Sequence, residues 1–395
     1  MYMKKLSSLL FVLALGVETM FADAVKIGSL YYNLNDEDKT AEVAPMPSGK
    51  YSGSITIPAK VTSEASVTYD VTGIGYAAFK FCHDLTSVTI PNSIVTVGEY
   101  AFYECEKLES IVYNDHVFAH LPESYSGKYT VPSGVELIAG GAFDHCSNLT
   151  TLEIPSSVTK IGEKATFYVC PNLTAINVEK GNTTYCSENG VVFSKDKTVL
   201  VACPNGKTGS YAVPNSVKTI GQYAFAACKK LQKVSLPYNL TTIENDAFFS
   251  AKGLTTINIP NSVTAIGEYA FAYCESMESV IIGSGVKTID EYTFLECITL
   301  SSITCRAVTP PVCAGENVFS SVDKTIPLYV PKNSVEVYIR ADVWKLFKNN
   351  THAIESAIDN VNNLSETTSR KVMQNGILYI EKNGELFNLN GARVK

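Results

Sequence analysis

The stretch LTTINIPNSVTAIGEYAFAYC, from Leu254 to Cys274, recurs along the chain. Close copies are LTSVTIPNSIVTVGEYAFYEC from Leu85 and LQKVSLPYNLTTIENDAFFSA from Leu231. Together they give the pattern L-x-x-[VI]-x-[IL]-P-x-x-[VL]-x-x-[IV]-G-x-x-A-F-x-x-C, with a common step of 23 residues. A repeat of this length, headed by L-x-x-V-x-I, is typical of leucine-rich coils, which bury a core only by stacking on their neighbours. We therefore predict a solenoid.

Each copy of the repeat predicts one short strand. In the copy that begins at Leu85, strand alternation places Val88 and Ile90 inward and Ser87 and Thr89 outward. The proline that follows cannot continue a hydrogen-bond ladder, so the strand should end there. The expected fold is a mainly β repeat solenoid of right-handed leucine-rich-type coils of about 23 residues, with short strands on one face.

Eight phenylalanines of the A-F element mark this frame. They are Phe79, Phe102, Phe143, Phe167, Phe225, Phe248, Phe271 and Phe294. Two gaps between them are long, at 41 and 58 residues. The first holds an insert near residues 113–132, which we interpret as a degenerate coil. The second holds an insert near residues 185–210, where VVF and TVLVA flank residues 194–197 and predict a hairpin. Both inserts are candidate sites of specificity.

The N-terminus has the character of a secretory signal peptide. Lys4 and Lys5 precede an apolar run from Leu9 to Val17, and small residues follow. We expect residues 1–22 to be removed and the protein to be secreted or held at the outer cell surface. No other stretch has the roughly 18 uncharged apolar residues of a membrane helix, so we expect no membrane insertion.

The repeat pattern and the composition divide the remaining chain into four regions. We expect N-terminal lead-in strands and a first coil at 23–80, the solenoid with its inserts and a C-terminal cap at 81–347, a linker at 348–370, and a small β tail at 371–395. The tail holds three strand-like pieces separated by Asn-Gly dipeptides, which favour hairpin turns.

Charge restricts the class of partner. The formal net charge is −7, and it becomes −8 when Lys4, Lys5 and Glu18 leave with the signal peptide. No basic block remains, which argues against nucleic acid or anionic membrane as the partner. An extracellular protein or a glycan is the expected ligand.

Cysteine recurs in one slot of the repeat. Its members are Cys82, Cys105, Cys146, Cys170, Cys228, Cys274 and Cys297. Equivalent residues of stacked coils lie roughly 4.8 Å apart with parallel side chains, whereas bonded sulfurs lie about 2 Å apart. We therefore expect a ladder of buried thiols, and Ala251 in the same slot supports this. Cys186 with Cys203, and Cys305 with Cys313, lie outside the slot and are the better disulfide candidates.

The coil pattern with A-F-x-x-C resembles the BspA-type leucine-rich-repeat family of secreted and cell-surface Bacteroidetes proteins. Residues 30–43 are similar to the family's lead-in strands, residues 309–347 to its closing coil and cap, and residues 190–206 to a recurrent insert. The tail is similar to C-terminal segments of exported Bacteroidetes proteins, some of which engage the secretion machinery. The resemblance implies an adhesion protein without a catalytic residue or cofactor.

Residues that might carry other chemistry have simpler interpretations. His116 and His120 have i, i+4 spacing but no further ligands nearby, so we interpret them as surface histidines and expect no metal site. The run Asn35–Asp38 lacks the glycine and distal glutamate of a calcium loop and predicts a solvated turn. Residues 144–147 read Asp-His-Cys-Ser, but neighbours in sequence do not form a catalytic triad.

Two surfaces are candidates for ligand binding. Outward strand positions should line a concave sheet, and they include Ser87, Thr89, Lys233, Thr256 and Asn258. Such a Ser/Thr-rich stripe also has a structural explanation in cross-strand hydrogen bonding. The second candidate is a row of tyrosines in the slot before A-F, formed by Tyr100, Tyr223, Tyr269 and Tyr292. These rings are suited to stack on a ligand or on the neighbouring coil.

Two functional hypotheses follow. In the first, the protein is a secreted or cell-surface recognition and adhesion protein that binds a host or microbial protein or glycan through its repeats. In the second, it is a structural envelope scaffold or spacer without a specific ligand. We do not expect an enzyme, because the sequence offers no catalytic motif.

Overall fold

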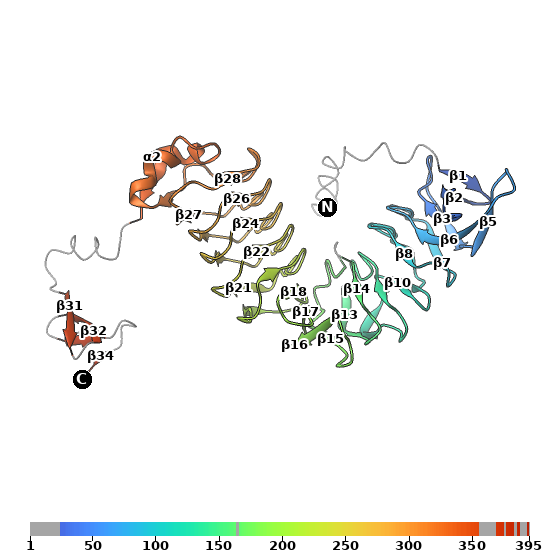
Figure 1. The fold of residues 1–395 in the computed structure, drawn as a ribbon, viewed down its shortest axis with the longest axis horizontal. Coiled ribbons are helices and arrows are strands. Elements are labelled where there is room, and N and C mark those ends of the chain that lie inside the picture. The colour runs from blue at the N-terminus through green and yellow to red at the C-terminus, as the bar shows by residue number, and fades with distance from the viewer. Residues whose placement is uncertain are drawn as a thin grey trace.

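The computed structural model describes residues 24–162 and 166–354, and the backbone of strands between residues 369 and 394. The predicted signal peptide, and residues 355–368 of the predicted linker, lie outside the described residues. Within the described part of the chain, no helix is long and apolar enough to cross a membrane. Residues 24–354 form a small N-terminal sheet followed by a curved solenoid (Figure 1).

The N-terminal sheet provides the predicted lead-in strands. Its order is β1 (Val25–Ile27), β2 (Leu30–Asn35), β3 (Thr40–Ala44), β6 (Thr68–Ile74) and β5 (Lys60–Thr62). The acidic run joins β2 to β3, and Asn35 Oδ1 accepts the backbone N–H groups of Glu37 and Asp38 there. The run is therefore an exposed hairpin turn.

The L-x-x-V-x-I segments form an outer row of parallel strands. It consists of β4 (Gly53–Thr56) with β7 (Leu85–Thr89), then β11 (Ser126–Thr130), β13 (Asn148–Ile154) and β15 (Ala175–Val178), then β19 (Gly209–Ala212), β21 (Leu231–Ser235), β23 (Thr256–Asn258), β25 (Ser279–Ile282), β27 (Ser302–Cys305), β29 (Leu328–Val330) and β30 (Thr351–Ala353). Thr256 pairs with Ser279, and Ser279 with Ser302, which confirms the step of one repeat.

A second, inner row of strands accompanies the first, and the repeat pattern did not indicate it. The T-I element before each glycine pairs with its counterpart in the next coil. The row consists of β8 (Thr96–Val97), β10 (Val117–His120), β12 (Leu137–Ile138), β14 (Lys160–Ile161), β18 (Val199–Ala202), β20 (Thr219–Ile220), β22 (Thr242–Ile243), β24 (Ala265–Ile266), β26 (Thr288–Ile289) and β28 (Val312–Cys313). It is interrupted between β8 and β10 and between β14 and β18.

The phenylalanines of the A-F element stack into a ladder along the core, in three runs. The runs are Phe79–Phe102, Phe118–Phe143–Phe167 and Phe225–Phe248–Phe271–Phe294–Phe319, with ring centroids 4.8–5.7 Å apart and nearly parallel planes. Phe118 and Phe319 belong to the ladder although the repeat pattern did not mark them. Buried aromatic pairs of this kind stabilise a core beyond their area alone.

The breaks in the ladder have a local cause. In a regular coil the phenylalanine N–H donates to the alanine carbonyl of the next coil, as Phe225 does to Ala247. Leu121 and Cys203 make this bond in place of a phenylalanine, to Ala142 and Ala224. Beside Leu121 the Phe118 ring still stacks on Phe143, but the Cys203 side chain does not fill the space of a phenyl ring, so the ladder stops at Cys203.

Both irregular inserts are integrated into the solenoid. Residues 113–132 form a coil with β9 (Val112–Tyr113), β10 and β11, as expected of a degenerate repeat. Residues 185–202 form an antiparallel meander of β16 (Tyr185–Glu188), β17 (Val191–Ser194) and β18, which confirms the hairpin across residues 194–197. A buried asparagine lies at the start of each insert, Asn114 in the first and Asn182 just before the second, and each forms four hydrogen bonds to backbone groups.

The solenoid bends so that its A-F corners face inward. β21 and β27 lie on the outer side of the bend, and β22, β24 and β26 lie on the inner side (Figure 1). Corners of distant coils meet inside the bend, since the Tyr168 ring lies 6.2 Å from Phe249 and the Tyr223 hydroxyl lies near Tyr100. The expectation that the L-x-x-V-x-I strands line the concave face is therefore wrong.

A cap closes the solenoid. It comprises η1 (Lys332–Ser334), α2 (Val335–Tyr338) and η2 (Trp344–Asn350), and the fully buried Trp344 and Phe347 pack edge-on against the last ladder ring, Phe319. η2 and β30 continue the solenoid through residues 348–353, which the sequence assigned to a linker. The tail has four described strands: β31 (Ser369–Gln374), β32 (Ile377–Lys382), β33 (Glu385–Phe387) and β34 (Arg393–Val394).

All eleven cysteines are free thiols. The slot thiols are buried, and several donate to the carbonyl of the ladder phenylalanine in an earlier coil, as Cys274 does to Phe248. This confirms the thiol ladder. The disulfides considered for Cys186 with Cys203 and for Cys305 with Cys313 are not formed; the Cys305 sulfur instead lies 3.1 Å from the hydroxyl of Tyr338.

Candidate binding surface

The tyrosine row lies on the inner corners in a left-handed backbone conformation. Tyr100, Tyr223, Tyr269 and Tyr292 have φ between 53° and 57°. A residue with a side chain rarely adopts this conformation, which is maintained only where the surrounding structure fixes it. Here the ladder and the backbone bonds between coils fix it. The repeat thus presents one tyrosine from the same turn in several coils.

Neighbouring tyrosines of the row also contact one another. The rings of Tyr269 and Tyr292 stack 4.8 Å apart at an interplanar angle of 8°. Asn317 donates a hydrogen bond to the Tyr292 hydroxyl at 3.3 Å. Packing on the neighbouring coil therefore explains part of the row, and one face or edge of each half-buried ring remains accessible.

Tyr223 connects two distant parts of the solenoid. Its hydroxyl lies close to Tyr100, which belongs to a coil far earlier in the chain, and to the carboxylate of Asp246. Burial and the nearby Asp246 charge raise the pKa of the Tyr223 hydroxyl. Corners that are far apart in the sequence therefore meet at Tyr223.

An inner aromatic patch surrounds Tyr223, and the sequence identified only part of it. The patch consists of Tyr168, Tyr223, Phe249, Tyr269 and Tyr273, which gather around the buried alanines Ala226 and Ala272. Tyr168 and Phe249 directly follow a ladder phenylalanine, and Tyr273 follows one by two positions. Aromatic residues one or two positions after a ladder phenylalanine could have indicated this patch from the sequence.

The outer Ser/Thr stripe has mainly intramolecular partners. Ser87 hydrogen-bonds to Ser54 at 2.6 Å, and Thr256 to Ser279 at 3.0 Å. Thr89, Lys233 and Asn258 are exposed on the same outer row. The structure therefore places these five candidates away from the tyrosine row, on the outer side of the bend (Figure 1).

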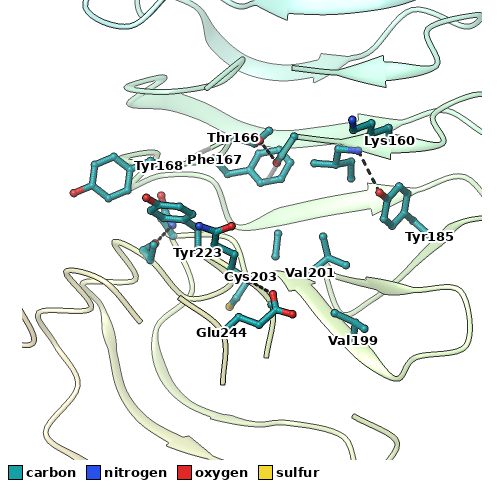
Figure 2. Close-up of a pocket in the computed structure, with 17 residues that line it drawn as sticks. Lys160, Thr166, Phe167, Tyr168, Tyr185, Val199, Val201, Cys203, Tyr223 and Glu244 are labelled. Atoms are coloured by element: carbon teal, nitrogen blue, oxygen red, sulfur yellow. Dashed lines mark hydrogen bonds between the residues drawn. The ribbon is translucent and has the colours of Figure 1, made fainter. Parts of the chain in front are cut away.

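A cavity of about 380 Å³ opens where the ladder and the inner row are both interrupted, between β14 and β18. Figure 2 shows its lining, with Phe167 and Tyr168 on one wall, Val199 and Val201 on the other, and Tyr185 at one end. Phe167 is 8 % exposed, whereas the ladder phenylalanines from Phe225 to Phe319 are fully buried. We call this space the apex cavity.

A smaller cavity lies at the other break in the ladder. Phe102, His120 and Asp144 contribute to its lining, and its volume of about 20 Å³ is enough for roughly one water molecule. His120 is buried rather than at the surface, which corrects the interpretation from sequence. Its Nε2 lies 3.3 Å from the Leu108 carbonyl, and its ring packs on Phe102.

Burial lowers the pKa of His120 to about 4. In the unfolded chain it binds a proton near pH 6.5, whereas the folded protein keeps it neutral. The free energy of unfolding should therefore fall by about 3 kcal/mol as the pH drops from 7 to 4. His120→Gln should remove this part of the acid dependence in urea unfolding measured across that range.

The matched control is the exposed His83, whose replacement by glutamine should leave the pH profile unchanged. Burial also raises the pKa values of Glu123 and Asp144, which favours the folded state in acid and opposes the His120 effect. The comparison of each variant with the parent isolates His120. Parallel profiles for the parent and His120→Gln would contradict the assignment.

The remaining sequence candidates do not form a reactive site. Asp144 pairs with His145 at 2.9 Å, but the Cys146 thiol points into the core and donates to the Leu121 carbonyl at 3.5 Å. Burial raises the pKa of Cys146, so this thiol is a poor nucleophile near neutral pH. Among the described residues, no group of three or more His, Cys, Asp or Glu side chains is placed to hold a metal ion.

Comparison with solved structures shows the fold. A leucine-rich repeat protein from Eubacterium ventriosum is 22 % identical, with 75 % of this chain and 94 % of that chain covered and a TM-score of 0.51. A leucine rich cell surface protein from Faecalibacterium prausnitzii is 24 % identical, with coverages of 85 % and 96 % and a TM-score of 0.44. The pneumococcal vaccine antigen PcpA is 20 % identical, with coverages of 85 % and 99 % and a TM-score of 0.48.

Comparison with family models assigns the repeats. None of the curated proteins matches this sequence. The model of the BspA type leucine rich repeat region matches residues 54–127, 115–197 and 201–326 in six copies, which together span more than half of the 395 residues. These are the coils whose A-F corners build the ladder and the inner surface. The chain belongs to the BspA-type leucine-rich-repeat family.

Proposed function

We propose that this protein is a secreted or cell-surface recognition protein that binds an extracellular protein or glycan on the inner side of its bend. The inner aromatic patch carries the proposal. Its five aromatic residues come from four coils, and all but Phe249 are only half-buried. Binding surfaces concentrate their energy in aromatic residues of this kind.

A comparison of the outer and inner surfaces also favours binding on the inner side. The outer row presents short hydroxyl side chains, several of which bond to one another. The inner side instead combines aromatic rings, the apex cavity and carboxylates such as Asp246 and Glu268 in one region. The inner side therefore brings large amphipathic side chains together in the way that suits a specific partner.

The chain from residue 24 onward should be screened against immobilised extracellular-matrix proteins and a glycan array. We expect saturable binding to at least one ligand. Tyr273→Ser should weaken it about tenfold, because loss of a central aromatic contact typically costs 1–2 kcal/mol or more. Tyr238→Ser is the matched control, because Tyr238 is 79 % exposed and lies in the turn between β21 and β22, outside the patch.

The two functional hypotheses give opposite results in this assay. A scaffold without a ligand would give no saturable binding to any matrix protein or glycan. Equal losses for Tyr273→Ser and Tyr238→Ser would place binding outside the inner aromatic patch. Thermal unfolding followed by circular dichroism checks that both variants remain folded.

A further inference from the structure

The apex cavity is a built feature of the fold. The Tyr185 hydroxyl accepts the Ile161 N–H at 3.2 Å, in the place where a neighbouring inner strand would otherwise pair. Asn205 accepts the Cys170 N–H at 2.9 Å and donates to the Ala226 carbonyl at 2.7 Å. These bonds connect the coils on both sides of the break. A cavity held open in this way binds a ligand without first having to order itself.

Part of its lining is apolar. Phe167, Val199, Val201 and Ala202 line it, and Cys203 occupies the slot where a ladder phenylalanine would otherwise fill the space (Figure 2). Val199 and Val201 are only partly buried, unlike the core valines of regular coils. A ligand that covered these side chains would gain from removing apolar area from water.

Polar groups surround this apolar part of the lining. Glu244 accepts the Gln222 N–H through Oε2 at 2.9 Å, and its side chain is exposed. Within the described chain, neither the Lys160 ammonium nor the Gln222 side-chain amide has a hydrogen-bond or ion-pair partner. Among the described residues, the lining thus holds one cation and one anion, whose charges cancel, and the free amide of Gln222.

We infer that the apex cavity binds one uncharged sugar ring of a glycan. A purely apolar ligand would form no hydrogen bond to Lys160, Gln222 or Glu244 at the cavity edge, and any of these groups that it removed from water would cost free energy. A sugar ring places its C–H face against aromatic and aliphatic side chains, and its hydroxyl groups both donate and accept at the edge. The volume of about 380 Å³ lies near the lower end for small-ligand sites and suits one or two rings.

The inference rests on the proposed function and deepens it. Tyr168 and Tyr223 belong both to the cavity lining and to the inner aromatic patch. A glycan with its terminal ring in the cavity can therefore continue across the patch, where further rings stack on tyrosine faces. In this arrangement the cavity anchors the terminal ring, and the patch contacts the rest of the glycan.

The test uses the chain from residue 24 onward and a glycan array with neutral and acidic terminal sugars, followed by titration with glucose, galactose, mannose, N-acetylglucosamine and sialic acid. Binding should favour a neutral terminal sugar. Val199→Trp fills the cavity and should weaken binding at least about tenfold. Glu244→Gln should weaken it about three- to tenfold through loss of a charged hydrogen bond.

Ala265→Trp is the control for Val199→Trp. Val199 and Ala265 occupy the same register of the inner row, through Thr219 and Thr242, but Ala265 lies outside the cavity. Its replacement should leave glycan affinity unchanged. Thermal unfolding of both variants shows whether either tryptophan damages the fold.

The possible failures are distinguishable. If glycans bind but Val199→Trp and Ala265→Trp behave alike, the sugar site is elsewhere and the recognition function stands. If only matrix proteins bind, the cavity inference fails alone. Preference for sialic acid would overturn the uncharged class, and absence of any saturable ligand would overturn both proposals.

Discussion

Phe271→Ala is expected to destabilise the solenoid by about 4 kcal/mol, because truncating a fully buried phenylalanine removes its burial energy and leaves a cavity. Phe271 is completely buried between Phe248 and Phe294, with ring centroids 4.9 and 5.5 Å away. Both stacking contacts are lost in the variant. Urea unfolding followed by circular dichroism measures the change in the free energy of unfolding.

Phe167→Ala is the matched comparison. Phe167 stacks on one side only, 5.7 Å from Phe143, and its other side faces the apex cavity. Its truncation enlarges an existing cavity and removes one ring contact, so we expect a cost of about 2 kcal/mol. Equal costs at the two positions would contradict the view that the ladder, rather than each phenylalanine separately, stabilises the coils.

The regular part of the fold follows from the sequence because its contacts join identical slots one repeat apart. The outer strands, the thiol ladder and most of the phenylalanine ladder could be predicted for that reason. Phe118 and Phe319 were missed because each lies 25 residues from its ladder neighbour instead of 23. The inner row was missed because strands of two residues leave almost no alternation to detect.

The bend and the cavities could not be predicted, because they depend on exceptions to the repeat. Leu200 and Ile220 are paired residues of the inner row. Cys203 comes three residues after Leu200, whereas Phe225, in the equivalent slot of the next coil, comes five residues after Ile220. This shortened corner omits the tyrosine turn, and near it distant corners meet, as Tyr223 does with Tyr100. A pattern with one period contains no information on contacts between coils so far apart.

The buried thiols should also make the solenoid unfold in mild alkali. Burial raises the pKa of Cys105 and Cys297 to about 12, and it raises those of Cys146, Cys170 and Cys274 as well. In the unfolded chain these thiols ionise near pH 9, while the folded protein keeps them protonated. Above that pH the unfolded state therefore releases protons that the folded state retains, and stability falls as pH rises.

At pH 10 each such thiol lowers the free energy of unfolding by about 1.4 kcal/mol. The five together lower it by on the order of 7 kcal/mol, which is comparable to the stability of a typical domain. The solenoid should therefore unfold between about pH 10 and 11. Alanine fills the same slot naturally at Ala251. Alanine at all five positions should lower stability at pH 7 but flatten its decline above pH 9, as measured by urea unfolding at each pH. An unchanged slope in that variant would mean that ionisation of other groups, such as the buried tyrosines, drives alkaline unfolding.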